Sequence, residues 1–492
     1  MQLIIFSLFL LYTALLFIIM WFSSRKATNK TYFTGNRKSP WFVVAYGMIG
    51  ASLSGVTFMS VPGDVATTQM TYFCVVLGYI LGYLVIAYLL LPLYYKLQLT
   101  SIYEYLGNRF GNEAHKTGAI MFIVSRLLGS ALRMYLMIYV LQIFIFDAWG
   151  IPLWFTALIM ITIILLYTFR GGIKTIVWTD TLQTTFMLTA LVITIIVIFK
   201  DLNVTFPEIW SKMSNYGYTK VFELDWQKPN YFIKHILGGM FITIAMTGLD
   251  QDMMQKNLTC KNLRDAQYNV MSFTGILVVV NALFLLLGGL LLIFAHEKGI
   301  DISNMATDRI YPEITFGYLG VFASIVFVIG LISAGYSSAD GTLTALTTSL
   351  CYDIIKIEKY IPDERKQVLV RRIIHILVAI LFLLVIIVFA QFHNKALITI
   401  IFTVAGYTYG PILGLFAFGI FSKREIEEPI LIPFIALLSP LICYFLSRYS
   451  TQLFMGYRFG FELLIVNGLI TFLGLWLIST KKKENYYKNL AD

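Results

Sequence analysis

Long apolar segments recur along the whole chain and restrict its fold more than any other feature. In hydrocarbon, backbone N–H and C=O groups must bond within the protein, so only helices or closed barrels can cross a membrane. The segments have roughly the 20 residues of a membrane-spanning helix, whereas barrel strands are about 10 residues long with alternating polarity. The composition agrees, because 58% of the 492 residues are hydrophobic and only 13% are charged. The sequence therefore predicts an all-α membrane protein.

We predict about thirteen membrane-spanning helices. Several of them exceed the ~20 residues that cross a bilayer, so they must tilt, kink or project beyond it. The expected spans are residues 2–22, 40–66, 69–95, 117–146, 151–169, 175–199, 231–254, 269–295, 316–350, 371–391, 396–421, 430–447 and 459–479.

The placement of Lys and Arg predicts the orientation of these spans. Most basic residues, Lys256 among them, fall in loops that share one side of the membrane, and a Lys triplet occupies 481–483. Because cytoplasmic loops are enriched in Lys and Arg, we expect the N-terminus outside and the C-terminus in the cytoplasm of a multi-pass cell-membrane protein. The basic charge thus indicates topology within the lipid bilayer and no nucleic-acid partner. No feature indicates an obligate protein partner.

Two expected spans contain small and polar residues where a regular span would be apolar. They read YGMIGASLSGVTFMSVPGD at 46–64 and GGMFITIAMTGLDQD at 238–252. The two are five spans apart, and an odd separation gives them opposite directions across the membrane. Paired Gly-interrupted helices in inverted halves are typical of the binding sites of secondary transporters. The alternative is that these small residues only allow close packing of helices.

Five sequence motifs carry a resemblance to a known family. They are GASLSG (50–55) with VPG (61–63), RGGIKTIVWTDTLQ (170–183), GLDQDMMQKNLTCKNLRDA (248–266), SAGYSSADGTLTALTTSLCYD (333–353) and YTYGPILGLFAFGIFSKR (407–424). With these motifs the chain resembles the sodium:solute symporter family, which has the leucine-transporter type of fold.

This resemblance implies a core of two inverted five-helix repeats. The expected units are an extra helix with a basic inner loop at 1–39, a first repeat at 40–200, an outer loop at 201–230, a second repeat at 231–425, and two C-terminal helices with a basic tail at 426–492.

The resemblance also implies a sodium site that links the two repeats. Its ligands would be carbonyl groups of Gly50 and Leu53 in the interrupted first span, together with Ala334, Ser337 and Ser338. The two serines follow Ala334 by three and four residues, so the three share one helical face. The alternative is that the serines only mediate helix packing.

Two acidic residues are candidates for a second ion or a proton. An unpaired carboxylate in an apolar span is costly, so Asp180 should meet a cation or a hydrogen-bond donor. In the family this position is implied to serve a second ion or ion release. Asp340 replaces part of the serine row that builds a second sodium site in some relatives, and it is either an anionic ligand or the partner of an arginine.

Arg126 and Arg133 lie seven residues apart, and therefore on one face of an apolar helix. A buried arginine indicates either a substrate route or a fixed ion pair, here with Asp64, Asp340 or Asp147. In relatives that carry acidic sugars, an arginine of this helix is implied to hold the carboxylate. The resemblance adds four further candidates for solute contact. They are Ser54, Thr57, Tyr407 and Tyr409, the two tyrosines being equally explained by aromatic packing.

Asp250, Gln251 and Gln255 stand near the inner end of the seventh expected span. They are candidates for an inner gate. The alternative is that they cap a helix and anchor cytoplasmic loops.

These features together predict a symporter that uses inward sodium movement to import a small polar solute. That solute would be an anion if an arginine binds it, such as a sialic acid or another organic acid. The alternatives are a proton-coupled carrier of a neutral, sugar-like solute, a membrane-embedded transferase and a transporter-like sensor. The five histidines are scattered and form no catalytic cluster, so we expect no enzyme activity.

Overall fold

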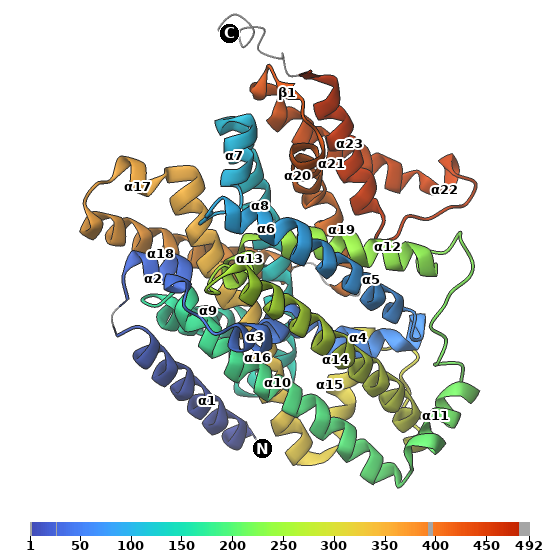
Figure 1. Cartoon of the computed structure of the whole chain (residues 1–492). Helices are drawn as coiled ribbons and strands as arrows, with labels where there is room; N and C mark the ends of the chain where they lie inside the picture. The colour runs from blue at the N-terminus through green and yellow to red at the C-terminus, as the bar shows by residue number, and fades with distance from the viewer. Residues whose placement is uncertain (1, 26, 392–396, 482–492) are drawn as a thin grey trace, which may run out of the picture.

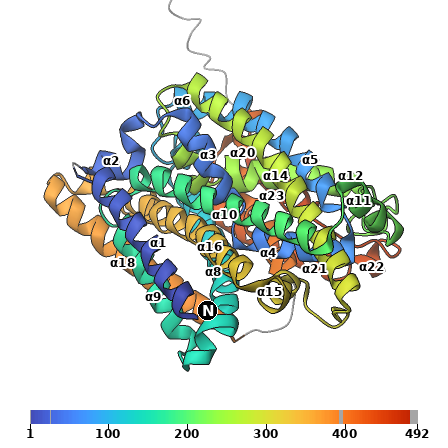
Figure 2. The ribbon, with the colours of Figure 1, turned by 90° about the horizontal axis from the view of Figure 1, so that it is seen from below.

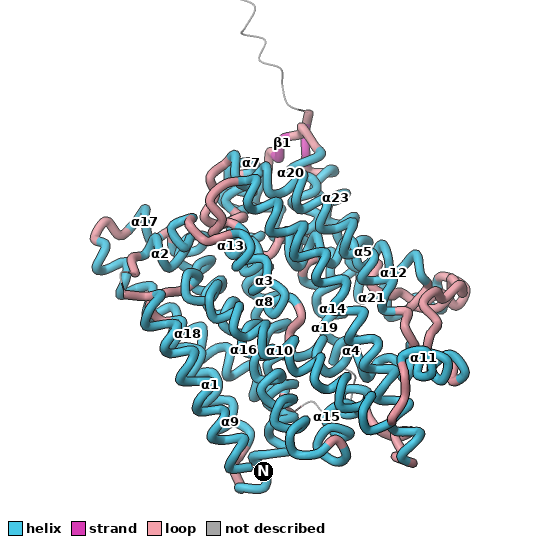
Figure 3. The backbone as a smooth tube through the Cα atoms, turned by 60° about the horizontal axis from the view of Figure 1, so that its bottom comes forward, coloured by secondary structure: helices cyan, strands magenta, loops and turns pink. Residues whose placement is uncertain are grey.

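The computed structural model describes residues 2–25, 27–391 and 397–481, and of residues 2–5 and 397–402 it describes only the backbone. Lys26 and the tail from residue 482 onward, which carry part of the predicted basic segments, lie outside the described residues. The chain is almost entirely helical, as Figure 3 shows. This confirms the predicted all-α class.

The first half of the chain supplies ten α-helices. In chain order they are α1 (Gln2–Ser23), α2 (Asn29–Thr34), α3 (Trp41–Ser52), α4 (Gly55–Thr68), α5 (Tyr72–Val85), α6 (Leu91–Lys96), α7 (Glu104–Phe110), α8 (Asn112–Leu141), α9 (Leu153–Thr168) and α10 (Ile173–Leu202). Short 3₁₀ or π turns join some of them, namely η1 (Gly35–Arg37), η2 (Ile86–Leu90), η3 (Gln142–Phe146) and η4 (Asp147–Trp149). The loop after α10 contains a further helix, α11 (Phe206–Asn215).

The second half continues the same pattern. Its helices are α12 (Phe232–Thr243), α13 (Gln251–Asn257), α14 (Leu263–Lys298), α15 (Thr307–Tyr318), α16 (Gly320–Ser349), α17 (Ile357–Tyr360), α18 (Glu364–Phe389), α19 (Leu397–Thr408), α20 (Gly410–Phe421), α21 (Ile432–Arg448), α22 (Ser450–Leu453) and α23 (Leu463–Leu477). The turns are η5 (Ile244–Gly248), η6 (Leu350–Ile355) and η7 (Pro429–Leu431). Two short strands, β1 (Glu425–Ile426) and β2 (Ser479–Thr480), pair antiparallel.

Each expected span has a helical counterpart, but fewer than thirteen of these segments are long and apolar enough to be counted as membrane spans. Within the described ranges, eight helical segments are long and apolar enough to cross a membrane, or ten if each of two bent pairs is one span. α9, α20 and α23 are apolar but shorter. The total of thirteen therefore stays a prediction.

The two interrupted spans are the two bent pairs. α3 and α4 form an angle of 57°, and the helix over α12 and η5 forms an angle of 70° with α13. The first bend occurs at Leu53 and Ser54, where the backbone leaves the helical conformation. One turn earlier, Gly50 lies against Thr184 of α10, so closely that a Cβ atom at position 50 would overlap the threonine hydroxyl. The small residues of this span thus allow both the bend and the close approach of α10.

The centre of the molecule is enclosed by helices from both halves. α3 packs against α10, α14 and α16, and α8 packs against α16. Figure 2 shows α3, α10 and α16 side by side at the middle of the bundle. α1 lies at the periphery beside α9, and the C-terminal helices α21 and α23 pack beside α20 (Figure 1). The bend of α3 and α4 therefore lies deep in the bundle.

Candidate functional site

The bend after α3 contacts the middle of α16. The Ser337 hydroxyl of α16 donates a hydrogen bond to the Gly50 carbonyl oxygen at 2.9 Å, and the Ala334 carbonyl oxygen lies 3.3 Å from the same hydroxyl. The Ser338 hydroxyl is buried and makes no hydrogen bond within the described residues. Leu53 follows directly after α3 as its C-cap. The structure thus brings three of the predicted ligands into contact, while Ser338 follows Ser337 directly in the chain and Leu53 follows Gly50 by three residues.

This cluster is made of neutral oxygen donors. Carbonyl and hydroxyl oxygens are the ligands that hard cations prefer in proteins. The C-terminal end of a helix also carries a partial negative charge, because its last carbonyl groups lack helical partners. Gly50 belongs to the last turn of α3. The arrangement can therefore attract a small cation without a carboxylate ligand.

Arg126 is buried between two acidic residues at the second bend. Its guanidinium forms an ion pair with Asp252, and its Nη1 lies 3.6 Å from Asp250 Oδ2. Its Nε also donates to the Thr342 hydroxyl of α16 at 3.1 Å. The Tyr409 hydroxyl donates to Asp250 at 2.5 Å. The charge of Arg126 is thus paired with protein carboxylates.

The acidic partners that we expected for the arginines are bound elsewhere. Asp64 accepts hydrogen bonds from two threonines of its own helix, and Asp147 accepts one from a glutamine of η3. Asp340 accepts from a tyrosine of α9. The prediction that one of these three residues pairs with Arg126 or Arg133 is wrong, because α13 brings its own carboxylates to α8.

A second buried ion pair lies next to the first. Lys256 Nζ of α13 is 2.8 Å from Asp180 Oδ2 of α10 and 3.8 Å from Asp252 Oδ1. Lys256 and Asp180 are each 1% exposed. The expectation that Lys256 lies in a basic loop is therefore wrong. Asp180 does meet a cation, as its burial requires.

Asp340 lies near this pair but has different partners. Its Oδ2 accepts from the Tyr167 hydroxyl at 2.8 Å and lies 3.4 Å from the Gln183 side-chain nitrogen. Its Oδ1 accepts from the backbone N–H of Gly341 at 2.6 Å. Among the described residues no basic group lies within ion-pair distance of Asp340.

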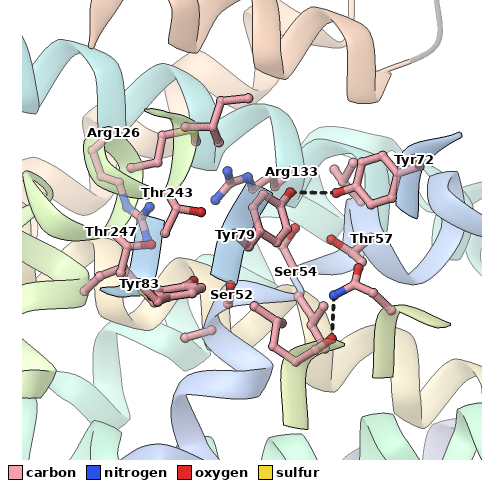
Figure 4. Close-up of a pocket in the computed structure, with 18 residues that line it drawn as sticks. Ser52, Ser54, Thr57, Tyr72, Tyr79, Tyr83, Arg126, Arg133, Thr243 and Thr247 are labelled. Atoms are coloured by element: carbon pink, nitrogen blue, oxygen red, sulfur yellow. Dashed lines mark hydrogen bonds between the residues drawn. The ribbon is translucent and has the colours of Figure 1, made fainter. Parts of the chain in front are cut away.

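A cavity of about 80 Å³ lies beside the bend of α3 and α4 (Figure 4). Hydroxyl and amide groups make up much of its wall, and the predicted contacts Ser54 and Thr57 are among them. The polar residues that line it are Ser52, Ser54, Thr57, Tyr72, Tyr79, Tyr83, Arg126, Arg133, Thr243, Thr247 and Asn281.

Arg133 lines this cavity from α8. Unlike Arg126, it makes no ion pair or hydrogen bond with any residue that the structure describes. Figure 4 shows its guanidinium beside Tyr79, whose hydroxyl lies 2.9 Å from that of Tyr72. An unpaired guanidinium inside a helical bundle can hold an anionic group.

The family model described as "Sodium:solute symporter family" matches residues 32–436. The chain belongs to this family. The resemblance inferred from the sequence motifs is thereby confirmed, and the chain is a sodium-coupled solute symporter whose bound ion is sodium.

Two curated relatives of the symporter are sodium/sialic acid symporters. That of Proteus mirabilis (strain HI4320) is 23% identical over 425 residues, which cover 84% of this chain and 83% of the relative. That of Aliivibrio fischeri (strain ATCC 700601 / ES114) is 24% identical over 422 residues, which cover 85% and 83%.

Solved structures show the same fold. A Na⁺-coupled sialic acid symporter in a substrate-bound, outward-open state aligns with a TM-score of 0.84 at 20% identity, over 97% of this chain and 99% of that one. A nucleobase-cation-symport-1 family transporter aligns with a TM-score of 0.58 at 14% identity, over 91% and 93%.

In the symporter, the three residues predicted at the inner gate anchor α13. Asp250 caps this helix by accepting from the backbone N–H three residues later. The Gln251 side chain accepts from one backbone group of segment 100–102 and donates to another, both at 2.9 Å. Gln255 donates to the Phe33 carbonyl at 2.6 Å and to a threonine of α16. Capping and anchoring are thus observed, and the gate stays a prediction.

The two predicted tyrosines of the symporter have different surroundings. Tyr409 contacts Asp250 and belongs to the charged network. Tyr407 is only half-buried and lies against Tyr444 of α21, with ring centroids 6.4 Å apart. Tyr407 is not among the residues that line the central cavity, and its role as a solute contact stays a prediction. The two side chains differ in direction because residues two apart on a helix point about 200° away from each other.

Several residues at the site were missed from sequence. Asp252 and Lys256 are four residues apart, a spacing that brings opposite charges together on a helix and could have drawn attention to them. Tyr72 and Tyr79 are likewise seven apart on α5 and share one face. Thr243, by contrast, stands in an apolar span with no signal of its own.

Proposed function

We propose that the symporter imports a small organic anion, and that Arg133 binds its carboxylate in the central cavity. The observation that carries this proposal is the contrast within α8. Arg126 has two acidic partners and Arg133 has none among the described residues, although both line the same cavity. An uncompensated charge inside a membrane protein is costly, and a bound anion would compensate it.

The chemistry of the cavity favours a carboxylate over a neutral solute. A guanidinium group offers a planar set of donors that matches both oxygens of a carboxylate, and it stays charged at any physiological pH. The threonine and serine hydroxyls around it can bind further oxygen atoms of the solute. A cavity of about 80 Å³ is small compared with the several hundred Å³ of most ligand sites, so a compact solute fits best without widening.

We propose that sodium binds between the bend and α16. Its ligands would be the carbonyl oxygens of Gly50, Leu53 and Ala334 and the hydroxyls of Ser337 and Ser338. This proposal is supported by the contact between Ser337 and Gly50 and by the Ser338 hydroxyl, which has no hydrogen-bond partner in the described part of the chain.

The bend itself can couple the ion to the solute. Gly50 and Leu53 lie before and at the break, and Ser54 and Thr57 follow it directly and line the cavity. A sodium ion that fixes the break would also fix these two side chains for the solute. By thermodynamic linkage, bound solute then raises the affinity for sodium by the same factor. No bond of the solute needs to be broken, so the cycle requires no enzyme activity.

The residues that anchor α13 would close the inner side of this cavity. Gln251 and Gln255 tie α13 to segments 100–102 and to Phe33, and Asp250 ties it to Tyr409. Because these contacts all involve one short helix, a displacement of α13 would break them together. We infer that α13 is the inner gate.

Uptake into proteoliposomes tests this function. Purified symporter would be supplied with radiolabelled sialic acid, short-chain carboxylates and a neutral hexose, each under a sodium gradient and under a matched choline control. We expect sodium-dependent accumulation of a carboxylate and none of the hexose. Uptake of the neutral sugar alone would contradict the role of Arg133. Uptake driven by a pH gradient without sodium would favour the proton-coupled alternative.

A further inference from the structure

We propose that the ammonium group of Lys256 is a built-in counter-cation for Asp180, so that this conformation of the symporter binds a single sodium ion. This inference rests on the proposed sodium site at Gly50 and Ser337, and it concerns a carboxylate of α10 that abuts α3 one turn before Gly50.

Among the described residues, Lys256 is the one partner of the Asp180 carboxylate. No hydroxyl, amide or backbone N–H group of these residues donates to either carboxylate oxygen, whereas Lys256 Nζ lies 2.8 Å from Oδ2. Both side chains are 1% exposed, so bulk solvent does not screen the charges of the pair. Removing a buried ion from water costs several kcal/mol, and a close opposite charge is needed to offset that cost.

The neighbouring carboxylates have other partners. Asp340 accepts hydrogen bonds from Tyr167 and from the backbone N–H of Gly341. Asp252 is paired with Arg126, and its distance to Lys256 is 3.8 Å, longer by about an ångström than the distance from Lys256 to Asp180. Lys256 is therefore paired with Asp180 more closely than with Asp252.

The position of Asp180 makes this pairing important for ion binding. A Cβ atom at Gly47 would lie 2.9 Å from the Asp180 Cβ atom, so Asp180 abuts α3 one turn before Gly50. A free carboxylate at this depth would itself attract a cation. With the ammonium group in contact, Asp180 has its cation supplied by the protein.

Lys256 is also attached to the helix that we infer to be the gate. It lies on α13, and its side chain reaches across to α10. If α13 moves away on opening, the ammonium group moves with it and Asp180 loses its partner. Asp180 then becomes available to a sodium ion leaving the site at Gly50. The number of cation sites thus depends on the position of α13.

Equilibrium binding of radioactive sodium to the purified full-length symporter counts the ions directly. The measurement would be made at alkaline pH, where a carboxyl group binds a proton least, on the wild type and on Lys256→Met, Lys256→Arg and Asp180→Asn. We expect one sodium ion per chain for the wild type, for Lys256→Arg and for Asp180→Asn. We expect two for Lys256→Met, because sodium replaces the missing ammonium group. The double variant Lys256→Met with Asp180→Asn should return to one.

Each outcome decides between the proposals. Two sodium ions on the wild type, falling to one in Asp180→Asn, would overturn the inference, and so would a folded Lys256→Met protein that still binds one. If Lys256→Met does not fold, the counts for the wild type and Asp180→Asn decide alone. No sodium binding to the wild type, or undiminished binding to Ser337→Ala with Ser338→Ala, would instead refute the proposed sodium site.

Discussion

Arg126 and Arg133 lie two turns apart on the same face of α8, yet only Arg126 has acidic partners among the described residues. Both guanidinium groups line the central cavity. The first is fixed between α13 and α16, whereas the second faces the cavity without a protein partner. Two arginines of the same chemistry therefore have different partners, and substitutions can test whether their roles differ as well.

Replacing Arg133 tests solute recognition. Arg133→Lys keeps the charge but loses the planar set of donors, so we expect the apparent solute affinity in proteoliposome uptake to fall. Hydrogen bonds to charged groups contribute about 1.5–3 kcal/mol, which corresponds to roughly 10- to 100-fold in affinity. Thermal stability should change little, because Arg133 makes no ion pair or hydrogen bond with the described residues that the substitution would break. Unchanged affinity in a folded variant would show that the solute binds elsewhere.

Replacing Arg126 should act on stability instead. Arg126→Met leaves the buried carboxylate of Asp252 without its closest partner, and such a change costs about 3–5 kcal/mol. We expect a lower melting temperature in detergent, and partial recovery when Asp252→Asn is combined with it. Full stability of the single variant would mean that the ion pair does not hold α13 in place.

Removing the serine hydroxyls tests the sodium site. Ser337→Ala combined with Ser338→Ala should raise the sodium concentration for half-maximal uptake, because two proposed ligands are lost. Solute affinity at saturating sodium should change less, since it is affected only through coupling. Ser324→Ala is a matched control on the same helix, because Ser324 is buried and bonds only backbone carbonyls. An equal effect of the control would indicate a packing defect.

Gly341 provides a test of the contact between α13 and α16. A Cβ atom at this position would overlap the Asp252 carboxylate, so Gly341→Ala should push Asp252 away from Arg126. We expect a loss of stability despite the gain of up to about 1 kcal/mol in helix propensity that alanine brings. Gly275→Ala on α14 meets open space and serves as the control. A stabilised Gly341→Ala protein would contradict the described packing.

The orientation of the chain is open to direct measurement. From the distribution of Lys and Arg we expect a C-terminal tag to resist protease added outside intact cells, and an N-terminal tag to be cleaved. Cleavage of the C-terminal tag from the outside would reverse the predicted topology. α13 would then lie toward the outer side of the membrane and could not be an inner gate.

The local features of the site could be predicted from the sequence, whereas the partners across helices could not. Small residues around Gly50 predicted the interruption of the second span, and the spacing from Ala334 predicted that Ser337 and Ser338 share a face. Lys256 follows the end of the expected span at residue 254, and the enrichment of Lys and Arg in cytoplasmic loops therefore placed it in a loop. Its burial depends on Asp180, which is distant in sequence, and local patterns contain no information about such a contact.

Tyr407 illustrates a different limit. It lies two residues before Tyr409, and residues two apart on a helix point about 200° away from each other. Tyr409 has helical backbone angles and its N–H donates a hydrogen bond to the Ala405 carbonyl, so helical geometry alone gives the two side chains different surroundings. The family resemblance suggested both tyrosines as solute contacts, whereas their spacing does not place them on one face.

The charges on α13 also have an electrical consequence. Together with Asp250, which caps the helix, α13 has two aspartates against Lys256, so with all three ionised residues 250–257 carry a net charge of −1 inside the membrane-embedded bundle. One elementary charge that crosses the whole membrane field changes its energy by about 2.3 kcal/mol per 100 mV. Movement of α13 along the field would therefore contribute a gating charge of the protein's own. The membrane potential would act on the helix as well as on the sodium ion.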